Sequence, residues 1–127
     1  MNSKEVDALV NLALEELSTA QTLYDSKKYR ACVTHSYYAI FNFAKALLLT
    51  ENFRSKKHDT IIKQFSLDFV KNNDFSRDIF QYYIDAKENR KKSSYDAFSD
   101  FNRIEAFESL TKAEDFIIEA KRILNSL

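Results

Sequence analysis

The 127-residue chain contains neither glycine nor proline, and this absence constrains its fold more than any other feature. Glycine supplies the left-handed backbone of tight hairpin turns without steric cost, and proline interrupts helices. A sheet protein without either residue would lack its usual turns. The dinucleotide fingerprint and the P-loop both require glycine. The sequence therefore predicts an all-α fold and excludes those two nucleotide-binding motifs.

The composition is typical of a globular chain. Hydrophobic residues make up 45% of the sequence and charged residues 30%, which favours a folded over a disordered chain. At this length a single domain, residues 1–127, can bury a core without disulfides or metals. The formal net charge is zero, so any attraction to nucleic acid must come from local clusters of charge.

Three features predict a cytoplasmic protein that does not enter a membrane. The amino-terminal segment carries acids among its apolar residues, unlike a signal peptide. The longest apolar run, residues 44–49, contains Lys45 and is far too short to span a bilayer. The single cysteine, Cys32, cannot form an intramolecular disulfide, as expected in a reducing compartment.

Apolar residues that recur at intervals of three and four predict five helices. The first two cover roughly residues 4–25 and 28–50. A shorter third helix lies between a loop at 51–57 and a stop at 72–74, and a fourth follows until a second loop, or a frayed turn, at 93–101. The last helix begins after Asn102 and continues to about Leu124. We expect an antiparallel up-and-down bundle of four main helices and one shorter helix.

Polar residues at the boundaries of these helices are the expected caps. Asn102 followed by Glu105 resembles a capping box. Asparagine can replace glycine in the left-handed turn that ends the third helix. The other predicted caps are Asp25-Ser26, Ser55 and Asp74. In the expected architecture the first, second and last helices form a frame, and the third and fourth form a hairpin on it.

Two basic runs are distant in sequence but would meet in this hairpin. One opens the third helix at residues 54–58, and the other closes the fourth at 90–92. Such a patch suits phosphate, through Coulomb attraction and the forked donors of arginine. For Lys91 and Lys92 the alternative is that they complement the dipole of the helix end. The candidate phosphate- or RNA-binding residues are Arg54, Lys56, Lys57, Lys91 and Lys92.

Arg90 differs from the other cations because it lies on the apolar stripe of its helix, four residues after Ala86. Its side chain should point toward protein, where a charge needs a partner, an interface or a ligand. The partner would be either a set of helix-end carbonyls or one of the acids Asp85, Glu88 and Asp96.

His58 would lie close to Arg90 in the hairpin, and Tyr95 follows the basic run in the loop. A lone histidine at a helix start is more often a capping or packing residue than a catalyst, and His35 is interpreted as a packing residue. Most aromatic residues are expected in the core, with Tyr37, Tyr38, Tyr82 and Tyr83 packing with a polar tip.

Neither a metal site nor a serine nucleophile is predicted. No His, Cys or acidic residues show a convincing ligand spacing. Ser36, Ser93 and Ser94 have no visible partners for a nucleophile triad. We therefore expect no metal and no cofactor.

Several stretches, taken in order, resemble the HEPN family and more narrowly its small stand-alone members. The resemblance covers nearly the whole chain, from about Val10 to Leu124. The matching stretches are residues 29–32, 36–41, 45–48, 56–58 and 65–70, and then Arg90 with Tyr95-Asp96.

The resemblance implies an antiparallel helical bundle that is usually dimeric. Active members of the family are metal-independent ribonucleases, in which two copies of an Arg, four to six residues, His motif meet across the dimer. Many act as toxins or defence components beside a small nucleotidyltransferase antitoxin. Arg90 matches the arginine of the motif, but the allowed histidine positions hold Tyr95, Asp96 and Ala97. The narrower group tends to show Arg, three residues, Asp-Tyr; here Ser94 replaces that aspartate, and Tyr95 matches.

These residues support two functions. In the first, a homodimer binds or cleaves RNA without metal: Arg90 stabilises phosphate charge, His58 acts as base or acid, and Tyr95 donates a proton or holds the phosphate. In the second, favoured by the missing motif histidine, the same patch holds a nucleotide, a phosphorylated ligand or a partner protein without catalysis. A plainer alternative is a dimeric scaffold in which Arg90 serves only the interface.

Overall fold

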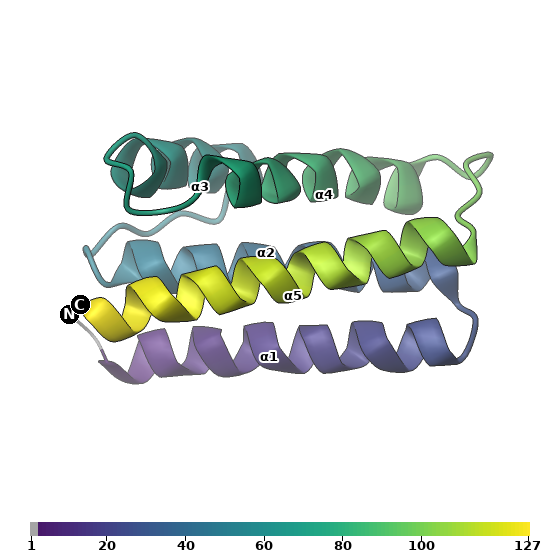
Figure 1. The fold of residues 1–127 in the computed structure, drawn as a ribbon, viewed down its shortest axis with the longest axis horizontal. Helices are drawn as coiled ribbons and strands as arrows, with labels where there is room; N and C mark the ends of the chain where they lie inside the picture. Colours follow the sequence, from purple (N-terminus) through teal and green to yellow (C-terminus); the bar gives the residue numbers. More distant parts are fainter. Residues whose placement is uncertain (1–2) are drawn as a thin grey trace.

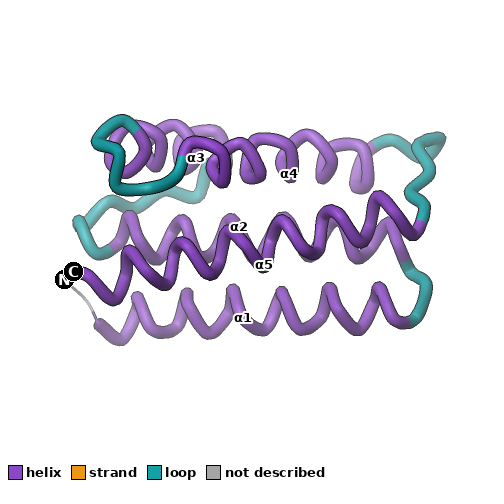
Figure 2. The backbone as a smooth tube through the Cα atoms, in the orientation of Figure 1, coloured by secondary structure: helices purple, strands orange, loops and turns teal. Residues whose placement is uncertain are grey.

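The computed structural model describes residues 3–127 and consists of helices and loops, with no strand in that part of the chain (Figure 2). The all-α prediction is confirmed. A π-helical turn, η1 (Ser66–Val70), continues the short third helix. The α-helices are α1 (Ser3–Asp25), α2 (Tyr29–Leu49), α3 (His58–Phe65), α4 (Arg77–Tyr95) and α5 (Arg103–Ser126).

The central helix of the bundle is α2, which contacts all four of the other helices. Figure 1 shows α1 on one side of α2 and the α3–α4 hairpin on the opposite side, with α5 lying lengthwise along the bundle. The predicted frame of first, second and last helices carrying a hairpin is therefore confirmed.

The sequence of α2 explains its central position, because it is apolar on nearly every side. Residues 39–44 and 46–49 are all buried, as expected for a helix surrounded by others. In contrast, the fully buried residues of α1 form one narrow stripe, Val6, Ala13 and Ala20. The two alanines on this stripe allow α1 to pack closely against α2.

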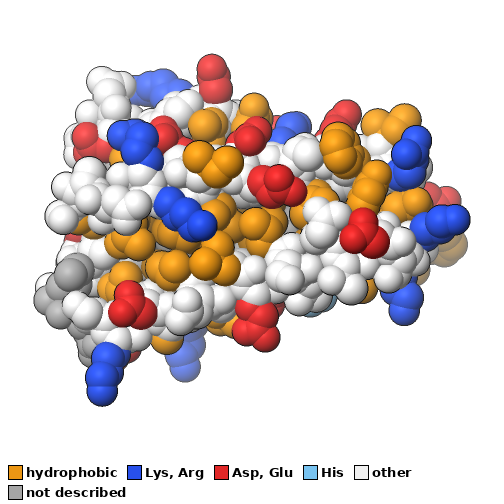
Figure 3. Space-filling model, turned by 60° about the horizontal axis from the view of Figure 1, so that its bottom comes forward, with side chains coloured by type: hydrophobic (Ala, Val, Ile, Leu, Met, Phe, Trp, Pro, Cys, Tyr) orange, Lys and Arg blue, Asp and Glu red, His pale blue; other side chains and the backbone are white. Residues whose placement is uncertain are grey.

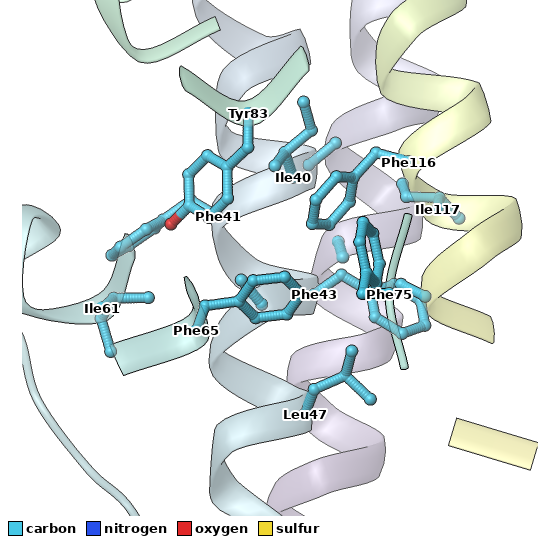
Figure 4. Close-up of a cluster of buried hydrophobic side chains, with 14 of the residues drawn as sticks. Ile40, Phe41, Phe43, Leu47, Ile61, Phe65, Phe75, Tyr83, Phe116 and Ile117 are labelled. Atoms are coloured by element: carbon cyan, nitrogen blue, oxygen red, sulfur yellow. The ribbon is translucent and has the colours of Figure 1, made fainter. Parts of the chain in front are cut away.

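An aromatic cluster ties the α3–α4 hairpin to the frame (Figure 4). The ring centroid of Phe65 lies 5.0 Å from that of Phe75 and 5.7 Å from that of Phe116 on α5. Tyr83 of α4 packs against the same Phe116 ring at 5.6 Å. Each fully buried aromatic side chain contributes about 2 kcal/mol, so the cluster holds the hairpin in one position over α2.

The capping box at Asn102 and Glu105 is present as predicted, and the Oδ1 atom of Asn102 accepts a hydrogen bond from the Glu105 N–H at 2.8 Å. Other predicted caps are wrong. Ser76, rather than Asp74, caps α4 by accepting from the N–H of Ile79 at 3.3 Å.

Neither α2 nor α3 has a side-chain cap; their N-cap residues are Lys28 and Lys57. Ser26 lies in the predicted turn but caps nothing, and Ser55 only accepts from the N–H of Lys57 inside the loop.

Left-handed residues other than glycine make the turns that follow α1, α2 and η1. Lys27, Asn52 and Asn73 have φ angles of 62°, 63° and 62°. Asparagine tolerates this region because its short side chain can bond locally to the backbone, and Asn73 lies at the predicted stop of the third helix. The chain thus turns without glycine at a modest steric cost.

No helix in residues 3–127 combines the length and hydrophobicity needed to cross a bilayer. On the face that Figure 3 brings forward, hydrophobic side chains gather in a band along the molecule. Lysine, arginine and acidic side chains are intermixed around this band (Figure 3). This face therefore carries no strong field of one sign.

Candidate functional site

The hairpin brings the first residue of α3 next to the end of α4. Nη2 of Arg90 lies 3.2 Å from Nδ1 of His58, and Arg90 is only 9% exposed. The arginine therefore points inward, as its place on the apolar stripe predicts.

Three tyrosine rings surround the guanidinium of Arg90. Its central carbon lies 5.3 Å from the ring centroid of Tyr37, 5.8 Å from Tyr38 and 5.4 Å from Tyr95. Cation–π attraction is strongest where the cation is desolvated, as it is here. Nη1 also donates a hydrogen bond of 2.9 Å to the hydroxyl of Tyr95.

No carboxylate in residues 3–127 pairs with Arg90, so the predicted acid partners are wrong. Glu88 pairs with Lys91 at 3.6 Å, and Asp85 lies 3.8 Å from Lys112. Asp96 accepts instead from the hydroxyl of Ser99 at 2.7 Å. Within residues 3–127 the guanidinium of Arg90 is therefore stabilised by aromatic rings, tyrosine hydroxyls and the imidazole of His58, with no carboxylate.

Arg90 retains hydrogen-bonding capacity. Nη1 donates one N–H to Tyr95 and Nη2 one to His58, and the guanidinium also bonds to the hydroxyl of Tyr37. These bonds do not use all five guanidinium donors. Nε is buried without a partner. Burial lowers the pKa of Arg90, but the hydrogen bond to Tyr95 and the neighbouring phenols outweigh it, and the pKa is raised overall. The group is a permanent cation with donors to spare.

His58 lies between aromatic rings from α2. Its ring stacks on Phe41 with centroids 4.1 Å apart, and its Nδ1 lies 2.6 Å from the hydroxyl oxygen of Tyr37. Because a guanidinium can only donate, Nδ1 accepts from Arg90, and we assign the ring hydrogen to Nε2. Nε2 makes no hydrogen bond to any of residues 3–127 and is available to a ligand.

Burial lowers the pKa of His58, and the charges of Arg90, Lys45 and Lys87 lower it further. Asp59 opposes these effects only weakly, because it forms an ion pair with Lys87. The imidazole is therefore neutral near pH 7. A neutral imidazole beside a permanent cation can donate to an anion or, in its other tautomer, accept a proton.

Tyr95 is the most accessible member of this group, with 77% of its surface exposed. Its hydroxyl accepts from Arg90, which leaves the phenolic hydrogen free to donate. Sequence analysis expected Tyr95 in a loop, whereas α4 continues to this residue.

The end of α4 is held by Arg30, which sequence analysis considered only as part of the family resemblance. Nη1 of Arg30 donates to the carbonyl oxygens of Lys92, Ser93 and Asp96 at 3.2, 2.8 and 3.0 Å. The hydroxyls of Thr34 and Ser93 are 2.7 Å apart. These contacts supply partners for the last carbonyls of α4, so the helix extends past the predicted boundary at Ser93.

The predicted basic patch is divided in the structure. Arg54 pairs with Glu5 of α1, and Arg54 and Lys56 line a pocket between α1 and α2. Lys57 is exposed beside His58, and Lys91 and Lys92 are exposed on the last turns of α4. The nearest additional cations, Lys45 and Lys87, act on His58 and were not predicted.

The ring of Tyr37 is buried, in agreement with the predicted packing role, and the hydroxyl at its polar tip contacts His58. Tyr37 and Phe41 lie one helical turn apart on α2, and this spacing was the available signal for a shared ring-binding face. The other histidine, His35, bonds to Glu16 of α1 at 2.6 Å, in agreement with a packing role. No group of three or more potential metal ligands occurs in residues 3–127.

Comparison with known proteins gives consistent matches over nearly the whole chain. The sequence model of the HEPN domain matches residues 6–126. Two proteins of Methanocaldococcus jannaschii are similar: "Putative toxin MJ0605" is 39% identical over 98% of this chain and 92% of its own, and "Putative toxin MJ0142" is 33% identical over 97% and 84%. The crystal structure of TT1696 from Thermus thermophilus superposes with a TM-score of 0.82 at 19% identity, covering 97% of this chain and 99% of that one, which supports the fold.

Proposed function

Because this chain belongs to the HEPN domain family, we propose that it is a toxin-type member that cleaves single-stranded RNA without a metal, with Arg90 and His58 at the reacting phosphate. Its similarity to two proteins named as putative toxins supports the biological class. The proposal includes a homodimer, the cytoplasm as location and a small nucleotidyltransferase as antitoxin, as the family resemblance implies.

One observation supports this function above others: a guanidinium without a carboxylate partner lies beside a neutral imidazole and an exposed phenol. A phosphodiester oxygen can accept from the remaining donors of the Arg90 guanidinium. Such charge-assisted bonds to arginine are short and strong. The same donors stabilise the additional negative charge of the pentacovalent transition state.

Cleavage requires a proton acceptor for the ribose 2′-hydroxyl. When phosphate binds to Arg90, Nη2 can donate to a phosphate oxygen instead of to Nδ1 of His58. The hydroxyl of Tyr37 can donate or accept, so Nδ1 can then carry the hydrogen and donate to Tyr37. In this tautomer Nε2 has a free lone pair and acts as the general base.

The resulting reaction balances in atoms and charge. Nε2 of His58 removes the 2′-hydroxyl proton, the 2′-oxygen bonds to phosphorus, and the bond from phosphorus to the 5′-oxygen breaks. Tyr95 donates its phenolic proton to the leaving 5′-oxygen. The products are a 2′,3′-cyclic phosphate and a 5′-hydroxyl, and proton exchange with solvent resets His58 and Tyr95.

An apolar surface on the hairpin supports the homodimer. Leu67 is 40% exposed and Ile84 36% exposed, and together with Ile62 and Phe80 they line one shallow depression. Ile84 lies on the same helix as Arg90.

The second candidate function is binding of a nucleotide or a phosphorylated partner without cleavage. Two observations favour it. In the free protein Nδ1 accepts from Arg90, so Nε2 is a donor rather than a base. In addition, no histidine follows Arg90 at positions 95–97. The same donors would then hold phosphate and leave the RNA intact.

Cleavage of single-stranded RNA in the presence of EDTA separates these functions. Wild type should cleave, and Arg90→Ala and His58→Ala should each lower the rate by about a hundredfold or more. His35→Ala and Arg103→Ala remove the same side-chain types from other surfaces and should retain wild-type rates. Binding without products from wild type would favour the second function, and unchanged cleavage by both site variants would contradict the assignment.

A further inference from the structure

A pocket of about 480 Å³ opens between α1, α2 and the loop that joins α2 to α3. This volume is within the range of small-ligand sites. Its wall is largely apolar and includes the aromatic ring of Phe53. The other apolar residues that form it are Ala8, Leu9, Leu49 and Ile61.

Cations surround this apolar wall. Lys45, Arg54 and Lys56 line the pocket together with the single acid Glu5, and Glu5 pairs with Arg54. Neither lysine has an ion-pair partner among residues 3–127. The pocket therefore combines an apolar wall with an excess of positive charge, which suits a ligand with a flat apolar body and a negative group.

This pocket adjoins the Arg90–His58 site through two residues. Nζ of Lys45 lies 5.4 Å from the ring centroid of Phe41, and Phe41 stacks on His58 at 4.1 Å. On α3, Ile61 in the pocket wall follows His58 by one helical turn. A chain molecule held at His58 can therefore continue into the pocket past Lys45.

We propose that this pocket binds one nucleotide of the RNA, the neighbour of the phosphodiester held by Arg90 and His58. Its base packs against Phe53 and the aliphatic wall, and its phosphate is attracted to Lys45 and Lys56. Stacking on an aromatic side chain accepts any base, so sequence preference at this position should be weak. This inference rests on the proposed function, because it takes RNA as the ligand of the adjoining site.

Filling the pocket from α1 tests the inference directly. Ala8 is exposed and lines the pocket, so Ala8→Trp should occupy it without disturbing the core. Ser18→Trp places the same side chain on an exposed position of α1 that lines none of the pockets described here. The probe is a single-stranded RNA hexamer with 2′-O-methyl groups, which cannot be cleaved through the 2′-oxygen. At fixed salt, Ala8→Trp should weaken its binding about tenfold, and Ser18→Trp should not change it.

An abasic scan identifies what occupies the pocket. Each position of the hexamer is replaced in turn by an abasic residue, and binding is measured to wild type and to Ala8→Trp. At one position the two losses should be non-additive, because the tryptophan already excludes that base. Additive losses at every position, or equal binding by Ala8→Trp and Ser18→Trp, would overturn the inference.

A charge variant tests whether Lys56 binds RNA within the pocket or only attracts the RNA backbone outside it. Lys56→Gln should weaken binding severalfold more than Lys71→Gln, an exposed control that follows η1. Loss with Lys56→Gln but none with Ala8→Trp would mean that the cations meet the backbone outside the pocket, and it would overturn the inference. Arg90→Ala could change neither binding nor cleavage while Ala8→Trp still weakened binding. This result would support nucleotide binding in the pocket and contradict the proposed function of Arg90.

Discussion

Nη2 of Arg90 lies 3.2 Å from Nδ1 of His58, although 32 residues separate them in sequence. The contact joins the end of α4 to the start of α3, and Tyr37 of α2 adds a further bond to the same imidazole at 2.6 Å. Three helices thus contribute to one polar group of atoms at the edge of the aromatic core.

The pH dependence of cleavage should report the lowered pKa of His58. Burial and the nearby cations hold this pKa below its ordinary value of 6.5. The base is active when neutral, so the rate should rise with pH to a midpoint below 6.5 and be flat near pH 7. Arg90→Gln removes a neighbouring cation and should move the His58 midpoint upward in an NMR titration. A midpoint at or above 6.5 in the wild type would be inconsistent with this environment.

The same shift predicts how stability depends on pH. Since the unfolded chain binds the His58 proton more tightly than the folded protein, the free energy of unfolding should fall as pH drops through 6.5. His58→Gln removes the titrating group. Urea denaturation of the two proteins at pH 7 and 5.5 should show a smaller loss in the variant, and equal losses would indicate that other groups dominate.

Tyr37→Phe should distinguish the contribution of the Tyr37 hydroxyl from the contribution of its ring packing. The bond to His58 is lost and the aromatic contacts remain, so cleavage should fall by about tenfold or more while RNA binding stays within about twofold. Tyr83→Phe is the matched control, because its buried hydroxyl has no partner. Removing an unsatisfied buried hydroxyl should leave stability unchanged or raise it by about 1 kcal/mol. A thermal melt and a cleavage assay on both variants test this pair, and equal cleavage would remove Tyr37 from the mechanism.

Arg30→Ala should loosen the end of α4. The carbonyl oxygens of Lys92, Ser93 and Asp96 lose the Arg30 donor, although those of Lys92 and Asp96 keep a backbone N–H donor. We expect a loss of about 1–2 kcal/mol in the free energy of unfolding. Hydrogen exchange should become faster at residues 92–96, and cleavage should fall because Tyr95 is less well positioned. Arg77→Ala, at the exposed start of the same helix, is the control. Unchanged exchange at residues 92–96 would show that Arg30 does not hold this segment.

The proposed homodimer should depend on the apolar surface of the hairpin. Ile84→Glu places a charge on that surface and should give a monomer in light scattering after size exclusion. Ile118→Glu, on α5 where Ile118 is 67% exposed, should leave the dimer intact. A dimer disrupted by Ile118→Glu and not by Ile84→Glu would move the interface to α5.

Much of the fold could be predicted from sequence because apolar spacing is a local property. The number of helices, the position of the α3–α4 hairpin and the Asn102–Glu105 capping box follow from it directly. The predicted caps at Ser26 and Ser55 are wrong because α2 and α3 begin without a side-chain cap. The predicted cap at Asp74 is wrong because another polar residue near the same boundary, Ser76, takes that role. Ser76, with φ −57° and ψ 129°, directs its hydroxyl to the N–H of Ile79.

The site was only partly predictable, because most of its contacts are tertiary. The inward direction of Arg90 follows from its position on one stripe, and its proximity to His58 follows from the hairpin. The roles of Arg30 and Tyr37 depend on the way α2 packs against α4 and α3. The spacing of Tyr37 and Phe41 indicates a shared face of α2, but it does not identify His58 as the partner. The separation of Arg54 and Lys56 from Arg90 has the same cause, since the loop after α2 turns toward α1.

The most direct test of the Arg90–His58 site is a double-mutant cycle on RNA cleavage in EDTA. If the guanidinium and the imidazole act on one phosphate as a unit, Arg90→Ala and His58→Ala should each lower the rate by about a hundredfold or more. The double variant should then be no slower than the slower single variant. Wild-type rates in either single variant, or a double variant whose loss equals the product of the two single losses, would contradict the assignment.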